Sequence, residues 1–427
     1  MNLKGKSGAA AAALAAVFGM GLFCSGCGEY FRPVANPIFP PGGDPQRTAH
    51  ALVLSSNGLN PGAAVVIDVS GDTNVATFTV GRNPVHAAFI SGTDYVVNQG
   101  DHNVNVFTLL DVGNPPNIVS LPGPSPLSPN APSASPVFAA AAGGKLFVAE
   151  PGLDNQVAVI DPATNTLSTQ ITVGHNPVAL VAIPNGTKLY CLNQADNSVS
   201  VIFPATNQVV TTIPVGASPV WGAVSSDGSR VFVVNQGSST VSVIDTTIGP
   251  TTDTVVNTFN VGTGPDYVVY ESTLNRAYVT SPAGNSLSII ENATGATPTV
   301  TMPAISLAGA PCHAQHAIAV TALADGTRAY VADDATNSVC VLNTTSNTFT
   351  KGIPVGTAPV FIASNSDSTR VYTANSGSFD ISIIQTSDDS TVKQSDGITP
   401  LTICAGPTPP STPCTAGFIP TFVLMTP

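Results

Sequence analysis

The chain has 427 residues, with 13 Lys or Arg and 25 Asp or Glu, which gives a formal net charge of −12 at pH 7. Phosphate backbones would repel so acidic a protein, and this argues against nucleic acid as a partner. Only 9 % of the residues are charged, whereas Gly and Pro number 38 and 37, a composition that favours short strands joined by many turns.

The N-terminal segment has the pattern of a targeting signal. Lys4 and Lys6 precede an apolar, Ala-rich stretch, Gly8–Phe23, of about sixteen residues, which is shorter than the roughly twenty residues of a membrane-spanning helix. The following Ser25-Gly26-Cys27 resembles the cleavage site of a bacterial lipoprotein. This resemblance implies cleavage before Cys27, a lipid on its thiol and contact with a membrane through that lipid. Ordinary secretion with a free Cys27 is the alternative.

Gly28, rather than Asp, follows the predicted lipidation site. By the same resemblance, this implies an outer-membrane lipoprotein of the cell envelope, facing either the periplasm or the cell surface. The expected organisation is a signal peptide over residues 1–26, the lipidated Cys27 with a Pro/Gly-rich tether over residues 27–47, and a single domain over residues 48–427.

The domain is built from a repeated unit of four short strands. In one copy the expected strands are Pro177–Ile183, Lys188–Asn193, Val199–Phe203 and Val209–Ile213. An anchor motif, Val-Gly-x-x-Pro, begins each unit and occurs at Val80–Pro84, Val173–Pro177, Val215–Pro219, Val261–Pro265 and Val355–Pro359, with degenerate copies ending at Pro136 and Pro311. Successive anchor prolines lie 41 to 52 residues apart, against about 40 to 50 residues for a propeller blade. The repeat therefore predicts an all-β fold, a β-propeller of four-stranded antiparallel blades.

The two ends of the domain are expected to share one blade. Ala51–Ser55, Ala64–Val69 and Val75–Val80 supply three strands, and Gly417–Leu424 resembles the missing innermost strand. Pairing them would close the ring and cover its edges. Seven anchored units and this composite one make eight blades; seven is the alternative if the terminal strands pair otherwise. Two Pro-rich insertions without a strand pattern, Gly113–Ser135 and Ile398–Ala416, interrupt the repeat.

A second motif follows the anchor in most units. It resembles the Tyr-Val-Thr-Asn tetrad of the YVTN-type β-propeller repeat family and occurs at Leu189–Asn193, Val231–Asn235, Ala277–Ser281, Ala329–Asp333 and Val371–Asn375. The resemblance covers residues 48–427 and implies a propeller. Members are described mostly as surface-layer or periplasmic repeat proteins, and related propellers include lactonases, lyases and haem-binding reductase domains. It therefore leaves the function open.

The anchors align one further position, two residues after each proline. It is aromatic or His in seven of eight blades. The residues are His86, Phe138, Ala179, Trp221, Tyr267, His313, Phe361 and, on the closing strand, Phe422. All except Ala179 are candidate ligand-binding residues, because side chains near the start of the innermost strands can converge on the channel mouth and stack on a carbohydrate, aromatic or peptide ligand. The alternative is a packing layer.

Asp266 replaces the valine that usually precedes this position. If the protein is an enzyme, Asp266 with His86, Tyr267 and His313 would be its catalytic residues. The alternative for Asp266 is a carboxylate satisfied by backbone amides. Cys312-His313-Ala-Gln-His316 contains metal-ligand types, but residues four apart on a strand lie about 13 Å from each other. We therefore expect no metal and, because no Cys-x-x-Cys-His is present, no haem or other cofactor.

Two pairs of cysteines fall within the repeat region. Cys404 and Cys414 bracket a Pro-rich stretch and are expected to form a disulfide in an oxidising envelope. Cys312 and Cys340 are expected on the first and third strands of one blade, about 9.6 Å apart. This exceeds the limit of about 7 Å for a bridge, so none is expected there.

These patterns favour a lipid-anchored propeller of the cell envelope that acts as a rigid, non-enzymatic binding scaffold, for a protein, small-molecule or carbohydrate partner that the sequence does not identify. One alternative is a lactonase- or lyase-like enzyme with its site at the channel mouth. Another is a self-associating surface-layer component.

Overall fold

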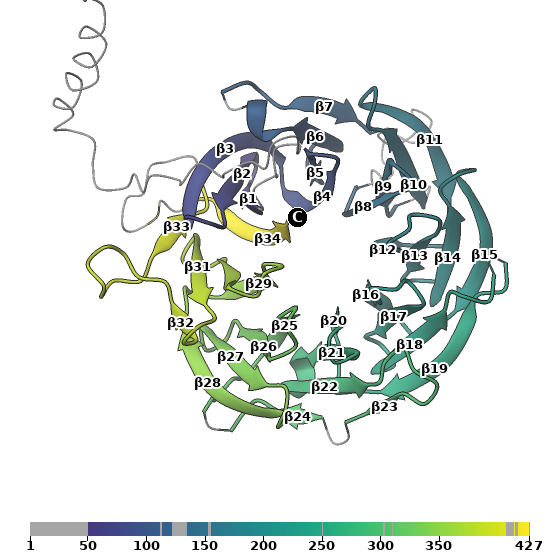
Figure 1. Cartoon of the computed structure of the whole chain (residues 1–427). Coiled ribbons are helices and arrows are strands. Elements are labelled where there is room, and N and C mark those ends of the chain that lie inside the picture. Colours follow the sequence, from purple (N-terminus) through teal and green to yellow (C-terminus); the bar gives the residue numbers. More distant parts are fainter. Residues whose placement is uncertain are drawn as a thin grey trace, which may run out of the picture. The chain divides into compact units, whose positions relative to one another are not determined.

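The computed structural model describes residues 50–111, 113–121, 135–152, 155–249, 251–301, 304–309, 311–406, 414 and 417–426. The predicted signal peptide and tether, with Cys27, lie outside the described residues. Eight antiparallel sheets of four or five strands follow one another around a closed ring (Figure 1). The prediction of an eight-bladed propeller is confirmed. In the part of the chain that the structure describes, no helix is long and apolar enough to cross a membrane.

The blades are numbered along the ring, and β34, β4, β8, β12, β16, β20, β25 and β29 are the innermost strands. Blade 1 consists of β1 (His50–Asn57), β2 (Asn60–Asp68), β3 (Thr73–Arg82) and β34 (Ile419–Met425). Blade 2 consists of β4 (Pro84–Ile90), β5 (Thr93–Asn98), β6 (Asn103–Phe107) and β7 (Asn117–Ser120). Blade 3 consists of β8 (Phe138–Ala142), β9 (Lys145–Glu150), β10 (Gln156–Asp161) and β11 (Thr166–Thr172). Blade 4 consists of β12 (Pro177–Ala182), β13 (Leu189–Asn193), β14 (Ser198–Phe203) and β15 (Gln208–Pro214).

The other half of the ring has the same order. Blade 5 consists of β16 (Pro219–Val224), β17 (Arg230–Asn235), β18 (Thr240–Asp245) and β19 (Thr254–Asn260). Blade 6 consists of β20 (Tyr267–Glu271), β21 (Arg276–Ser281), β22 (Ser286–Glu291), β23 (Thr299–Val300) and β24 (Ile305–Ser306). Blade 7 consists of β25 (Ala317–Ala322), β26 (Arg328–Asp333), β27 (Ser338–Asn343) and β28 (Thr348–Pro354). Blade 8 consists of β29 (Pro359–Ser364), β30 (Arg370–Asn375), β31 (Asp380–Gln385), β32 (Ser390–Thr391) and β33 (Thr402–Cys404). Two short 3-10 turns, Leu109–Asp111 and Pro282–Gly284, complete the elements.

The ring is closed by strands from both ends of the domain, as predicted. β1 and β34 are antiparallel, with Leu52 opposite Leu424 and Leu54 opposite Phe422. At the end of this pairing, the His50 backbone N–H donates to the Thr426 hydroxyl over 3.0 Å. The pairing covers the edge that β1 would otherwise present to solvent, which is how a propeller avoids an open sheet edge.

In blades 2, 4, 5 and 8, one contact explains the repeated tetrad and anchor motifs. The last tetrad residue, such as the fully buried Asn193, donates its side-chain amide to Ser198 and Ser200 on the third strand, over 3.1 and 2.9 Å. The anchor glycine packs against the same amide, and a Cβ on Gly174 would lie 2.7 Å from the Asn193 side chain. Asparagine at one motif therefore requires glycine at the other, which is why the two recur together.

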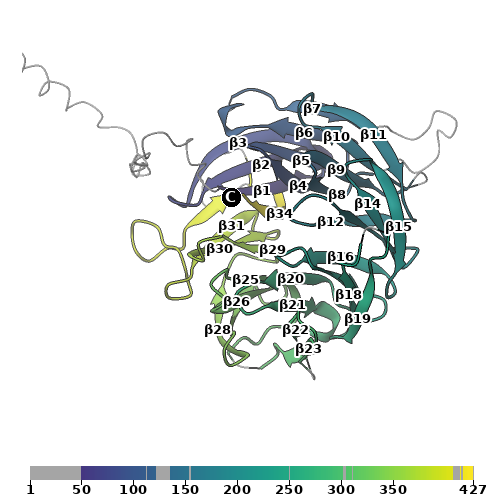
Figure 2. The same cartoon turned by 45° about the vertical axis from the view of Figure 1, so that its right-hand side comes forward.

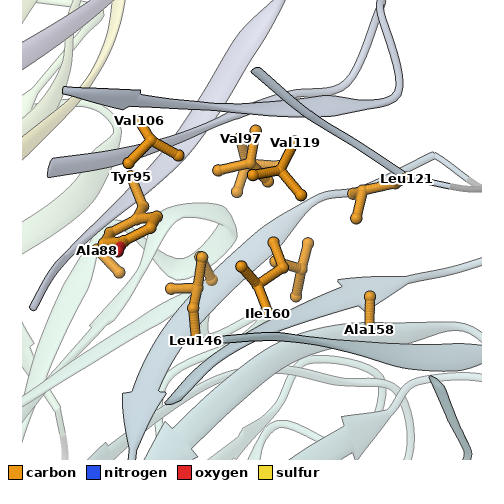
Figure 3. Close-up of a cluster of buried hydrophobic side chains, with 12 residues drawn as sticks. Ala88, Tyr95, Val97, Val106, Val119, Leu121, Leu146, Ala158 and Ile160 are labelled. Atoms are coloured by element: carbon orange, nitrogen blue, oxygen red, sulfur yellow. The ribbon is translucent and has the colours of Figure 1, made fainter. Parts of the chain in front are cut away.

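Hydrophobic clusters fill the spaces between neighbouring blades. Figure 3 shows the cluster between blades 2 and 3, where Tyr95 and Val97 face Leu146, Ala158 and Ile160. The stacked sheets are also visible in the oblique view of Figure 2. Because the second and third strands are buried on both faces, they are apolar almost throughout, whereas the outermost strands alternate between exposed and half-buried residues.

In blades 4, 7 and 8, polar latches at the start of the second strand add to this apolar packing. A latch is here a basic residue and a Tyr two positions later that both bind one acidic residue of the next blade. Lys188 and Tyr190 bind Asp253 over 2.8 and 2.7 Å. The same arrangement joins blade 7 to blade 8 through Arg328, Tyr330 and Asp389, and blade 8 to blade 1 through Arg370, Tyr372 and Asp72.

Two sequence expectations need correction, and a third is confirmed. Cys312 and Cys340 are bonded, with their Cα atoms 5.5 Å apart. The expected separation was wrong because β25 begins only at Ala317, and the turn that carries Cys312 folds over the outer strands of its own blade. There the Cys312 sulfur lies 3.7 Å from the Lys351 carbonyl oxygen. The two insertions are not wholly without strands, since they contain β7 and β33. The expected bond between Cys404 and Cys414 is present, with a Cα separation of 5.3 Å.

Candidate functional site

Six rings from the innermost strands form a closed aromatic layer across the axis of the propeller. Adjacent members lie 3.7 to 5.6 Å apart between ring centroids. The layer consists of His86, Phe138, Trp221, Tyr267, Phe361 and Phe422. Trp221 also reaches across the axis, since its ring lies 6.4 Å from those of both His86 and Phe361.

The members of the aromatic layer differ in how far solvent reaches them. His86 and Phe422 are buried, with 8 % and 7 % of their surfaces exposed, whereas Phe138, Trp221, Tyr267 and Phe361 are half-buried. The half-buried rings are those on which a ligand entering the channel can stack. The layer thus packs the centre of the ring and also leaves part of its aromatic surface accessible to a ligand.

His86 is held in a neutral, enclosed state. Its ring stacks on Phe138 with a centroid distance of 3.7 Å, and its Nδ1 accepts a hydrogen bond from the Ala139 N–H over 3.3 Å. Burial lowers the pKa of His86 to about 3. A side chain with so low a pKa stays unprotonated at neutral pH.

The predicted ring position in blade 7 is wrong. Ala317 pairs with Asp333 as Pro359 pairs with Asn375, so the residue of blade 7 that takes the layer position is Ala319. His313 is an exposed turn residue with φ of 56°, outside the aromatic layer. In this blade the anchor proline, Pro311, lies further from the start of the innermost strand than in the other blades. Counting two residues from it therefore placed the ring residue six positions too early.

A second set of polar side chains lines the channel mouth beside the layer. Each pairs a residue that precedes an innermost strand with a residue that follows a second strand, within one blade or across two. These rim pairs are Asn83–Gln99 at 2.7 Å, Asn176–Gln194 at 2.8 Å, Gln236–Asp266 at 3.1 Å and His316–Asp334 at 2.7 Å. At about 3.3 Å per residue, the rim lies within roughly 10 Å of the aromatic layer.

Asp266 belongs to this rim rather than to a network of backbone amides. Its carboxylate accepts from the Gln236 side chain of blade 5. The side chain contacts solvent, yet the channel wall crowds it, and this loss of hydration raises the pKa of Asp266 while the charge of nearby His316 opposes the shift. The neighbouring Tyr267 is in the layer, where burial raises the pKa of its hydroxyl.

Two of the four residues predicted for catalysis therefore lie side by side, and two do not join them. Asp266 and Tyr267 are adjacent at the mouth, His86 is enclosed in the layer, and His313 lies on an exposed turn. His316, paired with Asp334, is the imidazole that accompanies Asp266. The repeated Asn-Gln dipeptide at Asn98, Asn193 and Asn235 was the sequence signal for the rim. Among the described residues, no group of three or more His, Cys, Asp or Glu side chains is placed to hold a metal ion.

A separate cleft of about 480 Å³ lies between blades 1 and 2. Phe78, Val80 and Ile118 give it an apolar wall. The single charged residue among those that line it is Asp101, which is paired with Arg82. This cleft has no group suited to acid–base chemistry.

Comparisons with known proteins bear on the fold of the chain but not on its candidate site. No family model matches the chain, and no curated protein is similar to it in sequence. Solved structures with the same architecture include apo AztD from Citrobacter koseri, with a TM-score of 0.59 and 11 % identity over 89 % of this chain and 98 % of that one. The periplasmic gluconolactonase PpgL from Pseudomonas aeruginosa has a TM-score of 0.54 and 16 % identity over 89 % and 99 %. Hydrazine synthase from Kuenenia stuttgartiensis has a TM-score of 0.54 and 19 % identity over 72 % and 96 %. At such identities the likeness concerns the propeller fold alone.

Proposed function

We propose that this protein is a lipid-anchored propeller of the cell envelope that acts as a rigid binding scaffold, with its binding surface at the channel mouth. The observation that carries the proposal is the juxtaposition of half-buried aromatic rings with the polar rim pairs. A ligand site needs an apolar surface for contact and a few fixed polar groups for orientation, and the mouth offers both on rigid strands.

The non-enzymatic nature of the scaffold is supported by the state of the predicted catalytic groups. His86 is buried and neutral, and Tyr267 is packed against Trp221 with a centroid distance of 4.7 Å. Neither is placed to take up and release protons. The rim then serves to hold a ligand by hydrogen bonds rather than to transform it.

The lipid anchor rests on the pattern of residues 4–28. Its test is metabolic labelling with a fatty-acid analogue, followed by fractionation of cells that express the wild type or Cys27→Ala. The wild type should carry the label and sediment with membranes, and the variant should be unlabelled and released in soluble form. A labelled Cys27→Ala protein would contradict the anchor.

A second candidate function is hydrolysis of a lactone at the same mouth. The observation that favours it is Asp266, whose pKa is raised, close to the His316–Asp334 pair, on a fold shared with a gluconolactonase. A carboxylate with a raised pKa and an imidazole held by a second carboxylate are suited to general base catalysis on water. Hydrolysis of glucono-δ-lactone, measured by acid release, decides between the two functions. A rate above background that falls about 100-fold in Asp266→Asn would establish the enzyme, and no rate above background favours the scaffold.

A further inference from the structure

We propose that the channel mouth binds an uncharged carbohydrate, with the sugar rings on the aromatic layer and the hydroxyl groups on the rim pairs. The inference rests on the binding function proposed above and assigns a ligand class to that site. Three features of the mouth support it: the donors and acceptors that the rim leaves open, the accessible aromatic surface, and the pairing of its positive charges.

The rim offers donors and acceptors together. In the Asn83–Gln99 pair, one amide N–H donates to one carbonyl, and this leaves the Asn83 carbonyl and the Gln99 NH₂ group without a partner among the described residues. The Asn176–Gln194 pair is arranged in the same way. A sugar hydroxyl both donates and accepts, so it matches a rim that presents the two kinds of group side by side.

The aromatic layer supplies the matching apolar surface. Trp221, Phe138 and Phe361 are half-buried, so part of each ring faces the channel. Flat C–H faces of sugar rings stack on such surfaces, while the polar edges of the same rings reach the rim.

The charges at this face disfavour an anionic ligand. Arg82, His175 and His316 are each paired with an aspartate, at 2.5, 2.8 and 2.7 Å. The other arginines among the described residues, Arg230, Arg276, Arg328 and Arg370, begin second strands and so lie at the opposite end of their blades. Asp266 and Asp334 add negative charge to the rim. Phosphorylated or carboxylated sugars would therefore meet repulsion from these carboxylates, while Arg82, His175 and His316 already have a carboxylate partner.

Trp221 makes the test specific to this site, because it is the single tryptophan of the chain. The mature full-length protein in detergent is titrated with maltohexaose, cellohexaose and chitohexaose, and with hexagalacturonate as a size-matched anionic saccharide. We expect a saturable change in Trp221 emission with at least one of the neutral saccharides and none with hexagalacturonate. An equal or stronger response to hexagalacturonate, or no response to any neutral saccharide, would overturn the proposal.

Substitutions in the rim test whether the saccharide binds at the mouth or elsewhere on the protein. Asn176→Ala and Gln236→Ala should each weaken the neutral saccharide about tenfold, as expected for one or two lost hydrogen bonds. The matched control is Asn74→Ala, which removes an exposed amide from the outer strand β3 and should leave affinity unchanged. Circular dichroism and urea unfolding check that each variant is folded. Unchanged affinity in both rim variants would place the saccharide outside the mouth and overturn the assignment.

A second measurement distinguishes a wrong assignment of the ligand class from the absence of any binding site at the mouth. Gln194→Cys places a reactive thiol on the rim, and its alkylation is followed with and without isolated cell-envelope fragments or a mixed peptide library. If envelope fragments or peptides protect the thiol and no neutral saccharide gives a response, the mouth is a binding site but its ligand is not a carbohydrate. The absence of protection together with the absence of a saccharide response would overturn both.

Discussion

Arg370 and Asp72 form an ion pair with 2.9 Å between Nε and Oδ2, although they lie 298 positions apart in the sequence. The Tyr372 hydroxyl binds the same carboxylate over 3.3 Å, so both groups of blade 8 hold blade 1. Asp72 retains only 7 % of its surface exposed. This latch supplements the β1–β34 pairing, and the two together fasten the first blade to the last.

We expect Asp72→Ala to lower the free energy of unfolding by about 2–4 kcal/mol, because it leaves a partly buried guanidinium and a hydroxyl without their acceptor. Asp253→Ala should have an effect of similar size, since Lys188 and Tyr190 lose the same contacts. Asp101→Ala, which breaks the exposed pair with Arg82, should cost less than about 1 kcal/mol. Urea unfolding measures all three. An effect of Asp72→Ala no larger than that of Asp101→Ala would contradict the role of the latch.

The stability of the protein should depend on pH through His86. Its pKa is about 3 in the folded state because of burial, against the ordinary His value of 6.5. Between these values the unfolded chain binds a proton that the folded chain does not, so stability falls as the pH decreases from about 6.5 towards 3, by up to about 1.4 kcal/mol per pH unit.

His86→Phe should lower the slope of stability against pH by up to about 1.4 kcal/mol per pH unit, which corresponds to one proton. At pH 7 the variant should be less stable by about 1–3 kcal/mol, since the Ala139 N–H loses its acceptor. Urea unfolding of both proteins at pH 7, 6 and 5 gives the two slopes. Equal slopes for wild type and variant would show that His86 takes up its proton in the folded state.

The two disulfides should contribute unequally to stability. Their sequence separations are 28 residues for Cys312–Cys340 and 10 for Cys404–Cys414. The loop-closure model assigns about 3.5 kcal/mol to the longer loop and about 2.5 kcal/mol to the shorter one. Paired Cys→Ala variants, compared by urea unfolding under oxidising conditions, measure the two contributions. A Cys312→Ala/Cys340→Ala protein that is as stable as wild type would contradict this bridge.

The anchor glycine should not tolerate a methyl group. A Cβ on Gly174 would lie 2.7 Å from the buried Asn193 side chain, so we expect Gly174→Ala to cost about 1–3 kcal/mol. Gly309 is the matched control, because nothing lies within 4 Å of its Cβ position and its φ is not positive. Thermal unfolding of the two variants is the measurement. A destabilised Gly309→Ala beside an unaffected Gly174→Ala would reverse the explanation given for the anchor motif.

The strands could be predicted because the repeat states the same pattern many times. The expected Val199–Phe203 and Lys188–Asn193 agree within one residue with β14 and β13, since both are short apolar runs bounded by turn residues. Seven of the eight layer positions, counting Ala179 and the closing strand, followed from counting two residues beyond an anchor proline. That count failed in blade 7, where the turn around Cys312 delays the strand until Ala317.

The sequence by itself determined the propeller fold, most of its strands and the aromatic character of the layer, because these properties are local and periodic. It left seven or eight blades open, and the pairing of β1 with β34 decided for eight. Only the tertiary structure decided the contacts that join different units. Among these are the bond between Cys312 and Cys340, the Arg370–Asp72 latch and the pairing of Gln236 with Asp266. Each depends on how the chain crosses from one element to another, and no period in the sequence encodes that distance. The neutral state of His86 has the same origin, because it results from burial among rings of other blades.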